Sequence, residues 1–195
     1  RIEADIDLYV STDPALTNLD PLAIAAADKS LGRRGTEVIV YSNAEPGKIY
    51  YVGVKAEDQM AAEYAFLGVF SLEPFSQSGS NGLIVSGIPL PSVIPDGSPA
   101  DPGAALVLGV AVEPVTVRRA VVTSTVQHEN RGDLLGNLSH NDKFAVLNNH
   151  SFGNGNYAQT FIYEDNGEEI LQRTDGPGSL RDFVGEEGLG VWLLT

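Results

Sequence analysis

The stretch that decides the fold is Arg118–Leu134, which reads RRAVVTSTVQHENRGDL. Its first part alternates, so that one face of an extended chain carries Ala120, Val122, Ser124 and Val126. This period of two residues is typical of a β-strand. The polar run that follows contains Gly132, which favours a turn, and Leu134 begins a new apolar segment. The stretch therefore predicts a strand, a turn and a second strand.

The same β pattern continues through the C-terminal half of the chain. Short apolar segments separated by turn residues lie at Leu106–Val112, Val115–Val126, Leu134–Leu138, Phe144–Leu147, Gln159–Tyr163 and Gly190–Leu194. Short strands spaced by roughly 8–12 residues are typical of a β-sandwich or a jelly roll. No long segment with the 3.6-residue helical period competes with this pattern. The sequence therefore predicts an all-β fold.

The N-terminal part carries its own β segments and a different boundary region. The segments are Ile6–Val10, Thr36–Tyr41, Ile49–Val54 and Tyr64–Phe70, with a short helical turn at Leu22–Ala27. Residues 71–103 are rich in Ser, Gly, Pro and Asp, and we interpret them as a linker plus the entry strand of a second module. We therefore expect two β-sandwich modules, residues 1–75 and residues 76–195, of which the second is a jelly roll.

Composition narrows the range of functions. The 195 residues carry a formal net charge of −14, which disfavours binding to nucleic acids because phosphate backbones are also negative. There are no cysteines, which excludes disulfides, thiolate zinc sites and cysteine nucleophiles. No apolar run approaches the ~18 residues that a membrane-spanning helix needs. An acidic surface is compatible with calcium uptake, with a saline environment or simply with solubility.

A series of motifs in the C-terminal half occurs in a specific order. The motif His128-x-x-x-Gly132-Asp133-Leu134 follows the valine-rich strand. The flanking motifs are Ile94-Pro95-Asp96 with Gly103, Tyr163-Glu164-Asp165, Leu180-x-x-Phe183-x-Gly185 and Gly190-x-Trp192-x-Leu194. Together, over about residues 85–195, they resemble the P domain, or homo B domain, of proprotein convertases and related bacterial subtilisin-like proteases. The resemblance implies an eight-stranded jelly roll that accompanies a serine peptidase, with structural roles for His128, Gly132, Asp133, Leu134 and Trp192.

The chain departs from this family in two places. After Gly-Asp-Leu the family often has Ser-Pro-x-Gly-Thr, whereas residues 138–143 read LSHNDK and lack the Pro and the Gly. The strand that the family places after Trp192 is absent or shortened, so we expect the jelly roll to lack its last strand. Residues 76–195 are therefore expected to form a P-domain-like jelly roll without its final strand.

The N-terminal part has a resemblance of its own. The stretch Asp5–Val10, the pair Glu37-x-Ile39, the turn Pro46-Gly47 and the stretch Tyr50–Val54 are similar to the second half of a bacterial pre-peptidase C-terminal domain. Such domains are small β-sandwiches found beside secreted peptidases, so residues 1–75 are expected to be a partial sandwich of this type. A generic sandwich with a coincidentally similar first strand is the alternative.

Catalytic motifs do not emerge from the sequence. A subtilisin-like peptidase needs Ser, His and Asp, each in its own sequence context, and those contexts are not found. No His-Glu-x-x-His zinc motif occurs either. His128 is interpreted as a structural histidine rather than a catalytic base, because no nucleophile with a matching context accompanies it. Arg131-Gly132-Asp133 spells an integrin-binding tripeptide, but it overlaps the family motif and is interpreted as structural.

Two carboxylate pairs are candidate ligands for calcium. Glu164 and Asp165 precede Asn166-Gly167, and Asp5 and Asp7 are two residues apart. Carboxylate oxygens at such spacings suit Ca²⁺, although neither pair belongs to an EF-hand loop. Calcium in some members of both families adds to this expectation by analogy. Calcium is the only cofactor that the sequence suggests.

These observations favour a non-catalytic accessory region of a bacterial secreted or cell-surface protein. On this hypothesis the chain stabilises or regulates an adjacent subtilisin-like serine peptidase domain of the same polypeptide. One alternative is an extracellular binding module that recognises protein or glycan, since jelly rolls also host lectin functions. Another is a structural piece of a surface protein that has no peptidase.

Overall fold

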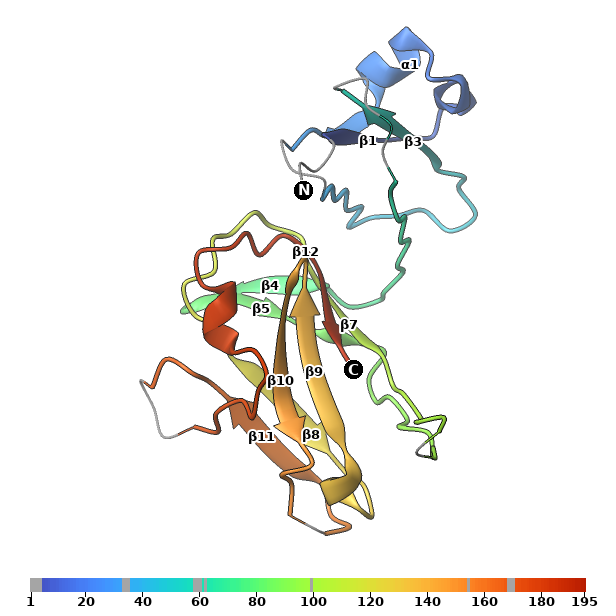
Figure 1. Cartoon of the computed structure of the whole chain (residues 1–195). Coiled ribbons are helices and arrows are strands. Elements are labelled where there is room, and N and C mark those ends of the chain that lie inside the picture. Colours follow the sequence, from blue (N-terminus) through green and yellow to red (C-terminus); the bar gives the residue numbers. More distant parts are fainter. Residues whose placement is uncertain are drawn as a thin grey trace. The chain divides into compact units, whose positions relative to one another are not determined.

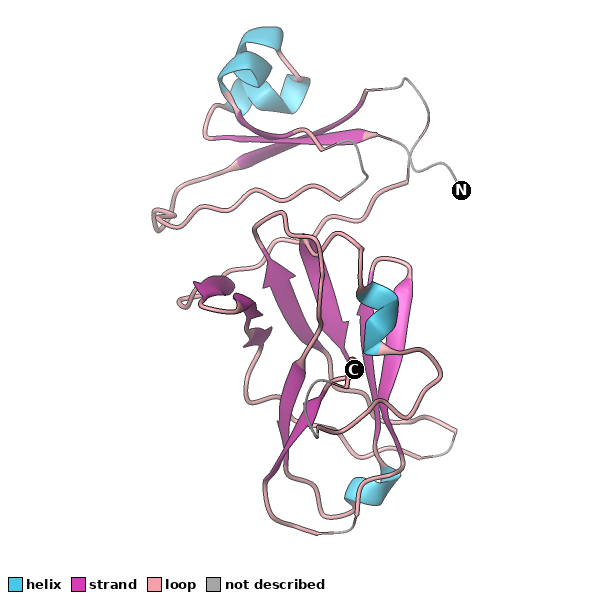
Figure 2. Ribbon diagram, turned by 90° about the vertical axis from the view of Figure 1, so that its left-hand side faces the viewer, coloured by secondary structure: helices cyan, strands magenta, loops and turns pink. Residues whose placement is uncertain are grey.

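A computed structural model describes residues 5–32, 36–57, 61, 63–98, 100–153, 155–167 and 171–195. The chain divides into two compact units, of which the first, here unit 1, ends at Pro74 and the second, unit 2, covers Phe75–Thr195. The division falls one residue before the expected boundary. Strands and loops make up most of both units, and the helical segments are short (Figures 1 and 2). No helix among the described residues is long and apolar enough to cross a membrane.

Unit 1 is built on a three-stranded antiparallel sheet with the order β2-β1-β3. Its elements are β1 (Ile6–Ser11), the 3-10 helix η1 (Pro14–Asn18), α1 (Pro21–Ala26), β2 (Asp28–Ser30) and β3 (Tyr51–Ala56). Each helical segment begins with a proline that follows a capping aspartate. The Asp13 carboxylate accepts the Ala15 N–H at 2.9 Å, and Asp20 does the same for Leu22. These caps satisfy amide groups that a helix start would otherwise leave unpaired.

The core of unit 1 is small. Among the described residues, its core cluster consists of Tyr9, Leu16, Ala23 and Ala27. Gly53 on β3 permits this packing, because a Cβ atom there would lie 3.0 Å from the Leu19 side chain and 3.6 Å from that of Leu16. The glycine thus lets the η1 segment lie directly on the sheet.

Two of the strands predicted for unit 1 are wrong. Thr36–Tyr41 lies outside the sheet, and side-chain contacts hold it instead. The Val38 N–H reaches the Ser30 hydroxyl oxygen at 3.3 Å, and the Tyr41 hydroxyl donates to Asp28 at 2.6 Å. Tyr64–Phe70 also lies outside any strand, and Phe70 is 90% exposed. Apolar alternation predicts a strand only where one face is buried, and this segment has no buried face.

The described residues of unit 2 form three antiparallel sheets. The largest has the strand order β10-β9-β12-β7-β6, and the two smaller ones pair β11 with β8 and β4 with β5. The strands are β4 (Ser76–Gly79), β5 (Gly82–Val85), β6 (Gly87–Ile88), β7 (Val107–Ala111), β8 (Val122–Val126), β9 (Leu135–His140), β10 (Lys143–Asn149), β11 (Gln159–Tyr163) and β12 (Gly190–Leu194). Two 3-10 segments, η2 (Arg131–Asp133) and η3 (Leu180–Phe183), complete the unit.

The core of unit 2 lies between the β9–β10 face and the β8–β11 pair. Its buried members are Leu138, Ala145, Leu147, Phe161, Tyr163, Leu180 and Phe183. They come from both sheets and from η3, which gives a sandwich-like arrangement. The prediction of an all-β fold is confirmed. The jelly-roll topology remains a prediction, as does the loss of a final strand, although β12 pairs with β9 on one side and β7 on the other.

Most strand predictions in unit 2 match, and the exceptions have local causes. The expected linker, residues 71–103, contains β4, β5 and β6. The predicted strand Val115–Val126 is shorter than expected and is confined to Val122–Val126. Its first residues pair elsewhere: the Val117 amide donates to the Glu186 carbonyl at 2.9 Å, and the Gly188 amide donates to the Val115 carbonyl at 2.7 Å.

The β10 edge of the large sheet is covered by a glycine-rich loop. The Val146 amide donates to the Pro177 carbonyl at 3.0 Å, and the Gly176 amide donates back to the Val146 carbonyl at 3.1 Å. Gly178 has φ +79°, and a Cβ there would lie 2.2 Å from the Phe144 carbonyl oxygen. Only glycine fits this approach, which pairs an otherwise open strand edge.

Candidate functional site

The Gly-Asp-Leu motif forms the η2 turn between β8 and β9. The Asn130 amide donates to His128 Nδ1 at 3.1 Å, so this half-buried histidine helps to shape the turn. Backbone bonds from the Asp133 amide to the Asn130 carbonyl and from the Leu134 amide to the Arg131 carbonyl close it. The Asp133 side chain is exposed. The motif residues thus serve as a connection between two strands.

Arg131 is directed into the protein. Its side chain is 1% exposed, and its Nη1 atom donates to Gln159 Oε1 at 2.6 Å. The guanidinium lies 4.7 Å from the ring centroid of Tyr157, which is a cation–π distance. A buried arginine cannot be presented to a receptor as part of an Arg-Gly-Asp tripeptide, which agrees with the structural interpretation of that tripeptide.

Trp192 belongs to an aromatic cluster that joins three parts of unit 2. Its ring stacks on His140 with centroids 4.1 Å apart and planes 1° from parallel, and it lies 5.1 Å from Phe183. The indole N–H donates to the Gly188 carbonyl at 2.9 Å. Both imidazole nitrogens of His140, which is 3% exposed, lie 2.8 Å from backbone carbonyl oxygens, those of Val191 and Glu187. The segment Gly190–Leu194, which forms β12, is therefore packed against β9.

Asp165 is a buried hydrogen-bond acceptor at the end of β11. Its Oδ1 accepts the Thr174 amide at 3.0 Å, and its Oδ2 accepts the Thr174 hydroxyl, the Ser179 hydroxyl and the Leu180 amide at 2.7–2.8 Å. Burial alone would raise the pKa of this carboxyl, but the bonds from Ser179, Thr174 and Leu180 outweigh it and hold the pKa below its usual value. The charge fixes the loop that leads to η3.

Glu164 is equally buried, at 2% exposure, and holds the turn beside it. Its two oxygens accept the amides of Asn166 and Gly167, at 2.5 and 3.1 Å, and Arg119 Nε lies 3.6 Å from Oε1. Glu164 and Asp165 therefore bind different donors on different segments. The carboxylate oxygens that could serve as calcium ligands accept hydrogen bonds from protein N–H and O–H groups.

Asp5 and Asp7 lie at the start of unit 1. Asp7 is 2% exposed and accepts the Tyr9 hydroxyl at 2.8 Å. Burial is the main cause that raises the pKa of the nearby Glu37 carboxyl, and the negative charges of Asp7 and Asp5 raise it further. Hydrogen bonds from Ser30 and Gly32 act in the opposite direction. The two carboxylate pairs that the sequence suggested as calcium ligands therefore lie in different units. Among the described residues no three His, Asp or Glu side chains converge as a metal site would require.

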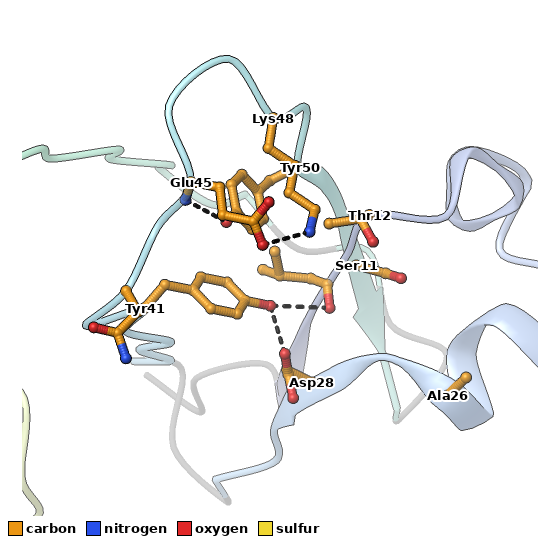
Figure 3. A pocket seen from close by; sticks show the side chains of 10 residues that line it. Ser11, Thr12, Ala26, Asp28, Tyr41, Glu45, Lys48 and Tyr50 are labelled. Carbon is orange, nitrogen blue, oxygen red and sulfur yellow. Dashed lines mark hydrogen bonds and ion pairs between the residues drawn. The ribbon is translucent and has the colours of Figure 1, made fainter.

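Unit 1 has a pocket of about 330 Å³ at one end of its sheet (Figure 3). In the sheet register Val10 pairs with both Asp28 and Val52, and Ser11 pairs with Tyr51, so β1 ends where β2 and β3 begin. Residues 41–50, which lead into β3, cover this end. The walls therefore come from three strand ends and one loop.

Two tyrosine rings form one wall of the pocket. The centroids of Tyr41 and Tyr50 are 4.9 Å apart and the ring planes are tilted by 38°. The Tyr41 hydroxyl donates to Asp28 Oδ2 at 2.6 Å, while the Tyr50 oxygen accepts the Glu45 amide at 3.3 Å. Burial, followed by the bond to Asp28, raises the pKa of Tyr41 to about 12, so its phenol stays protonated at neutral pH. Both rings are thus fixed by their hydroxyl ends.

Polar groups line the rest of the pocket. Lys48 Nζ lies 2.9 Å from Glu45 Oε1, and both side chains face the tyrosine wall (Figure 3). Ser11, Thr12 and Asn43 add hydroxyl and amide groups. The arrangement offers an apolar surface surrounded by hydrogen-bond donors and acceptors, which suits binding rather than bond-making chemistry.

Sequence reasoning did not find this pocket. Its aromatic residues lie in two segments that were interpreted as strands, and Asp28 lies next to the helical turn. Only folding brings them to one sheet end. The available signal was a tyrosine at each end of a turn-rich loop, Tyr41 and Tyr50, which is too common to be specific.

Comparison of the chain with protein-family models, with curated proteins and with solved structures finds no match.

Proposed function

We propose that this chain is a non-catalytic accessory region of a bacterial secreted or cell-surface protein, in which unit 2 stabilises or orients an adjacent subtilisin-like serine peptidase. The observation that carries the proposal is the internal use of the motif side chains. His128 shapes a turn, Asp165 accepts four hydrogen bonds, and Trp192 stacks on His140. Residues used in this way build a scaffold, and a scaffold acts on a neighbour through its rigidity and its surface.

The proposal is supported by the pairing of the first and last strands of unit 2. Strand β12, which ends at Leu194, is paired on both sides. Next to it, the Asn137 amide donates to the Thr195 carbonyl at 2.8 Å, and the Thr195 amide donates to the Asn137 carbonyl at 3.0 Å. The opening strands β4 to β6 are likewise hydrogen-bonded into sheets. Strands paired in this way can present a rigid surface to an attached domain, and stabilisation of that domain would come from the interface between the two.

The test begins with the reading frame that encodes the chain, which we expect to encode a subtilisin-like domain. In that whole protein, Asp165→Asn should lower the temperature at which peptidase activity is lost irreversibly, while kcat/KM at 25 °C stays unchanged. Asp133→Asn, which alters an exposed carboxylate of the same unit, is the matched control and should change neither quantity.

Two results would contradict the proposal. One is a reading frame without a peptidase domain, which would favour a surface protein. The other is hydrolysis of casein by the purified chain itself, abolished by His128→Ala, which would make this chain the enzyme.

A further inference from the structure

We propose that the tyrosine pocket of unit 1 binds a neutral sugar ring. The inference does not depend on the peptidase neighbour, because every residue that forms the pocket belongs to unit 1. It starts from the combination of an aromatic wall with a polar rim. A sugar has the complementary surface, since its C–H face is apolar and its edge carries hydroxyl groups that both donate and accept.

The aromatic wall is held ready for stacking. Tyr41 is 37% exposed and is fixed by its bond to Asp28, and Tyr50 is fixed by the Glu45 amide. Rings that are already oriented lose little conformational freedom when a ligand stacks on them. Because both hydroxyls are engaged in these hydrogen bonds, the ring surfaces are the parts that a ligand would contact.

The rim supplies both kinds of hydrogen-bonding group. The Asp28 carboxylate uses Oδ2 for Tyr41, which leaves Oδ1 as an acceptor. The Ser11 oxygen accepts the Asp13 amide at 3.1 Å, so its own O–H is free to donate. Lys48 spends one of its three N–H donors on Glu45. Sugar hydroxyls require such a mixture of donors and acceptors.

Charge and ring geometry select a neutral ligand. The Lys48–Glu45 pair is self-compensating, which leaves the Asp28 carboxylate to repel acidic sugars and phosphates. A cation would gain most between two separated ring faces, but the Tyr41 and Tyr50 rings contact each other at 4.9 Å. The volume of about 330 Å³ is at the lower end of the range for small-molecule sites.

The experiment is calorimetric titration of the whole chain with defined tetrasaccharides. The neutral probes are maltotetraose, cellotetraose, xylotetraose, mannotetraose and chitotetraose, with tetragalacturonate as the acidic probe and tetralysine as the basic one. We expect at least one neutral probe to bind with a dissociation constant on the order of 1 mM or tighter. Tetragalacturonate and tetralysine should bind at least about tenfold more weakly.

Variants locate the binding. Tyr41→Ala and Tyr50→Ala should each weaken it about tenfold or more, whereas Tyr64→Ala, which removes a 58% exposed tyrosine outside the pocket, should not change it. If either alanine variant unfolds, Asn43→Ala decides the matter. Asn43 is an exposed pocket residue, and its loss should weaken binding a few-fold without affecting the fold.

Three outcomes would overturn the proposal. The first is failure of every neutral probe to bind. The second is binding that Tyr41→Ala, Tyr50→Ala and Asn43→Ala all leave unchanged, which would place the ligand elsewhere. The third is preferential binding of tetralysine that is lost in the tyrosine variants, which would make the pocket a site for basic peptides.

Discussion

The acidic side chains singled out in the two units differ in their surroundings. In unit 2, Glu164 and Asp165 are almost fully buried, and backbone amides and hydroxyls surround their oxygens. In unit 1, Asp28 and Glu45 lie at an open pocket and keep acceptor capacity toward solvent. A carboxylate whose bonds are all internal stabilises a fold, and one whose bonds are incomplete is available to a ligand. This difference supports the structural role that we propose for unit 2 and the binding role that we propose for unit 1.

The cores differ in the same direction. Among the described residues, the core cluster of unit 2 has seven buried members from two sheets and η3, whereas that of unit 1 has four. No residue is shared between the two clusters. We therefore expect the units to respond separately to core mutations, and the following predictions test this from the largest effect to the smallest.

The largest effect is expected for Phe183→Ala. The side chain is 0% exposed and contacts the Trp192 ring, so its loss leaves a cavity beneath the aromatic cluster. Deletions of this kind cost about 3–5 kcal/mol. Urea unfolding followed by Trp192 fluorescence should show the change in the free energy of unfolding of unit 2. Phe144→Ala, on a 49% exposed ring of β10, is the control and should cost much less.

Leu16→Ala should lower the free energy of unfolding of unit 1 without changing that of unit 2. Leu16, on η1, is 0% exposed and packs against Gly53 of β3, and its truncation should cost about 3 kcal/mol. Since the only tryptophan is in unit 2, far-ultraviolet circular dichroism should detect an early transition that Trp192 fluorescence does not follow. Coincident loss of both signals would mean that the units unfold as one.

These contrasts also explain what the sequence could and could not predict. Gln159–Tyr163 and Gly190–Leu194 were predicted with their observed bounds, because each is a short segment rich in apolar residues that lies next to turn residues. Thr36–Tyr41 has the same apolar pattern but is held by side-chain bonds to Ser30 and Asp28, which are distant in sequence. Periodicity reports a tendency to be buried, and tertiary partners decide whether burial occurs.

The same distinction between local pattern and tertiary partner applies to the candidate sites. Glu164 and Asp165 were recognised as a chemically notable pair, but their donors include Thr174, Ser179 and Leu180, up to 15 residues away. No local pattern reveals that these donors surround the carboxylate. The pocket was not found because Tyr41 reaches Asp28 across 13 residues of loop and strand. Motif reading finds residue types, whereas the pairing of donors with acceptors depends on the fold.

Asp165→Asn should cost an intermediate amount, about 2–3 kcal/mol at pH 7, because hydrogen bonds to a charged acceptor are lost. The pKa of Asp165 is lowered by folding, so its stabilising effect is complete above the unfolded-state value of about 3.9 and is lost as pH falls through the lower folded-state pKa. Chemical unfolding from pH 7 to pH 2 should therefore show the variant and the wild type converging in acid. A difference that persists undiminished at pH 2 would assign the effect to packing.

The smallest effect is expected for Tyr41→Phe, which keeps the ring and removes the bond to Asp28. Because the group is partly exposed, the cost should be only about 0.5–1 kcal/mol at pH 7. Folding raises the pKa of this phenol to about 12, so its contribution is present below the unfolded-state value of about 10 and disappears as pH rises through 12.

An absorbance titration at alkaline pH supplies the second measurement for this variant. The amplitude of the phase near pH 12 should fall in Tyr41→Phe, while Tyr9, whose pKa burial and Asp7 also raise to about 12, keeps the remainder. Tyr64→Phe should leave the free energy of unfolding unchanged, since its ring is exposed outside the pocket. An unaltered phase near pH 12 in Tyr41→Phe would mean that Asp28 does not fix the ring, and the preorganised aromatic wall of unit 1 would lose its basis.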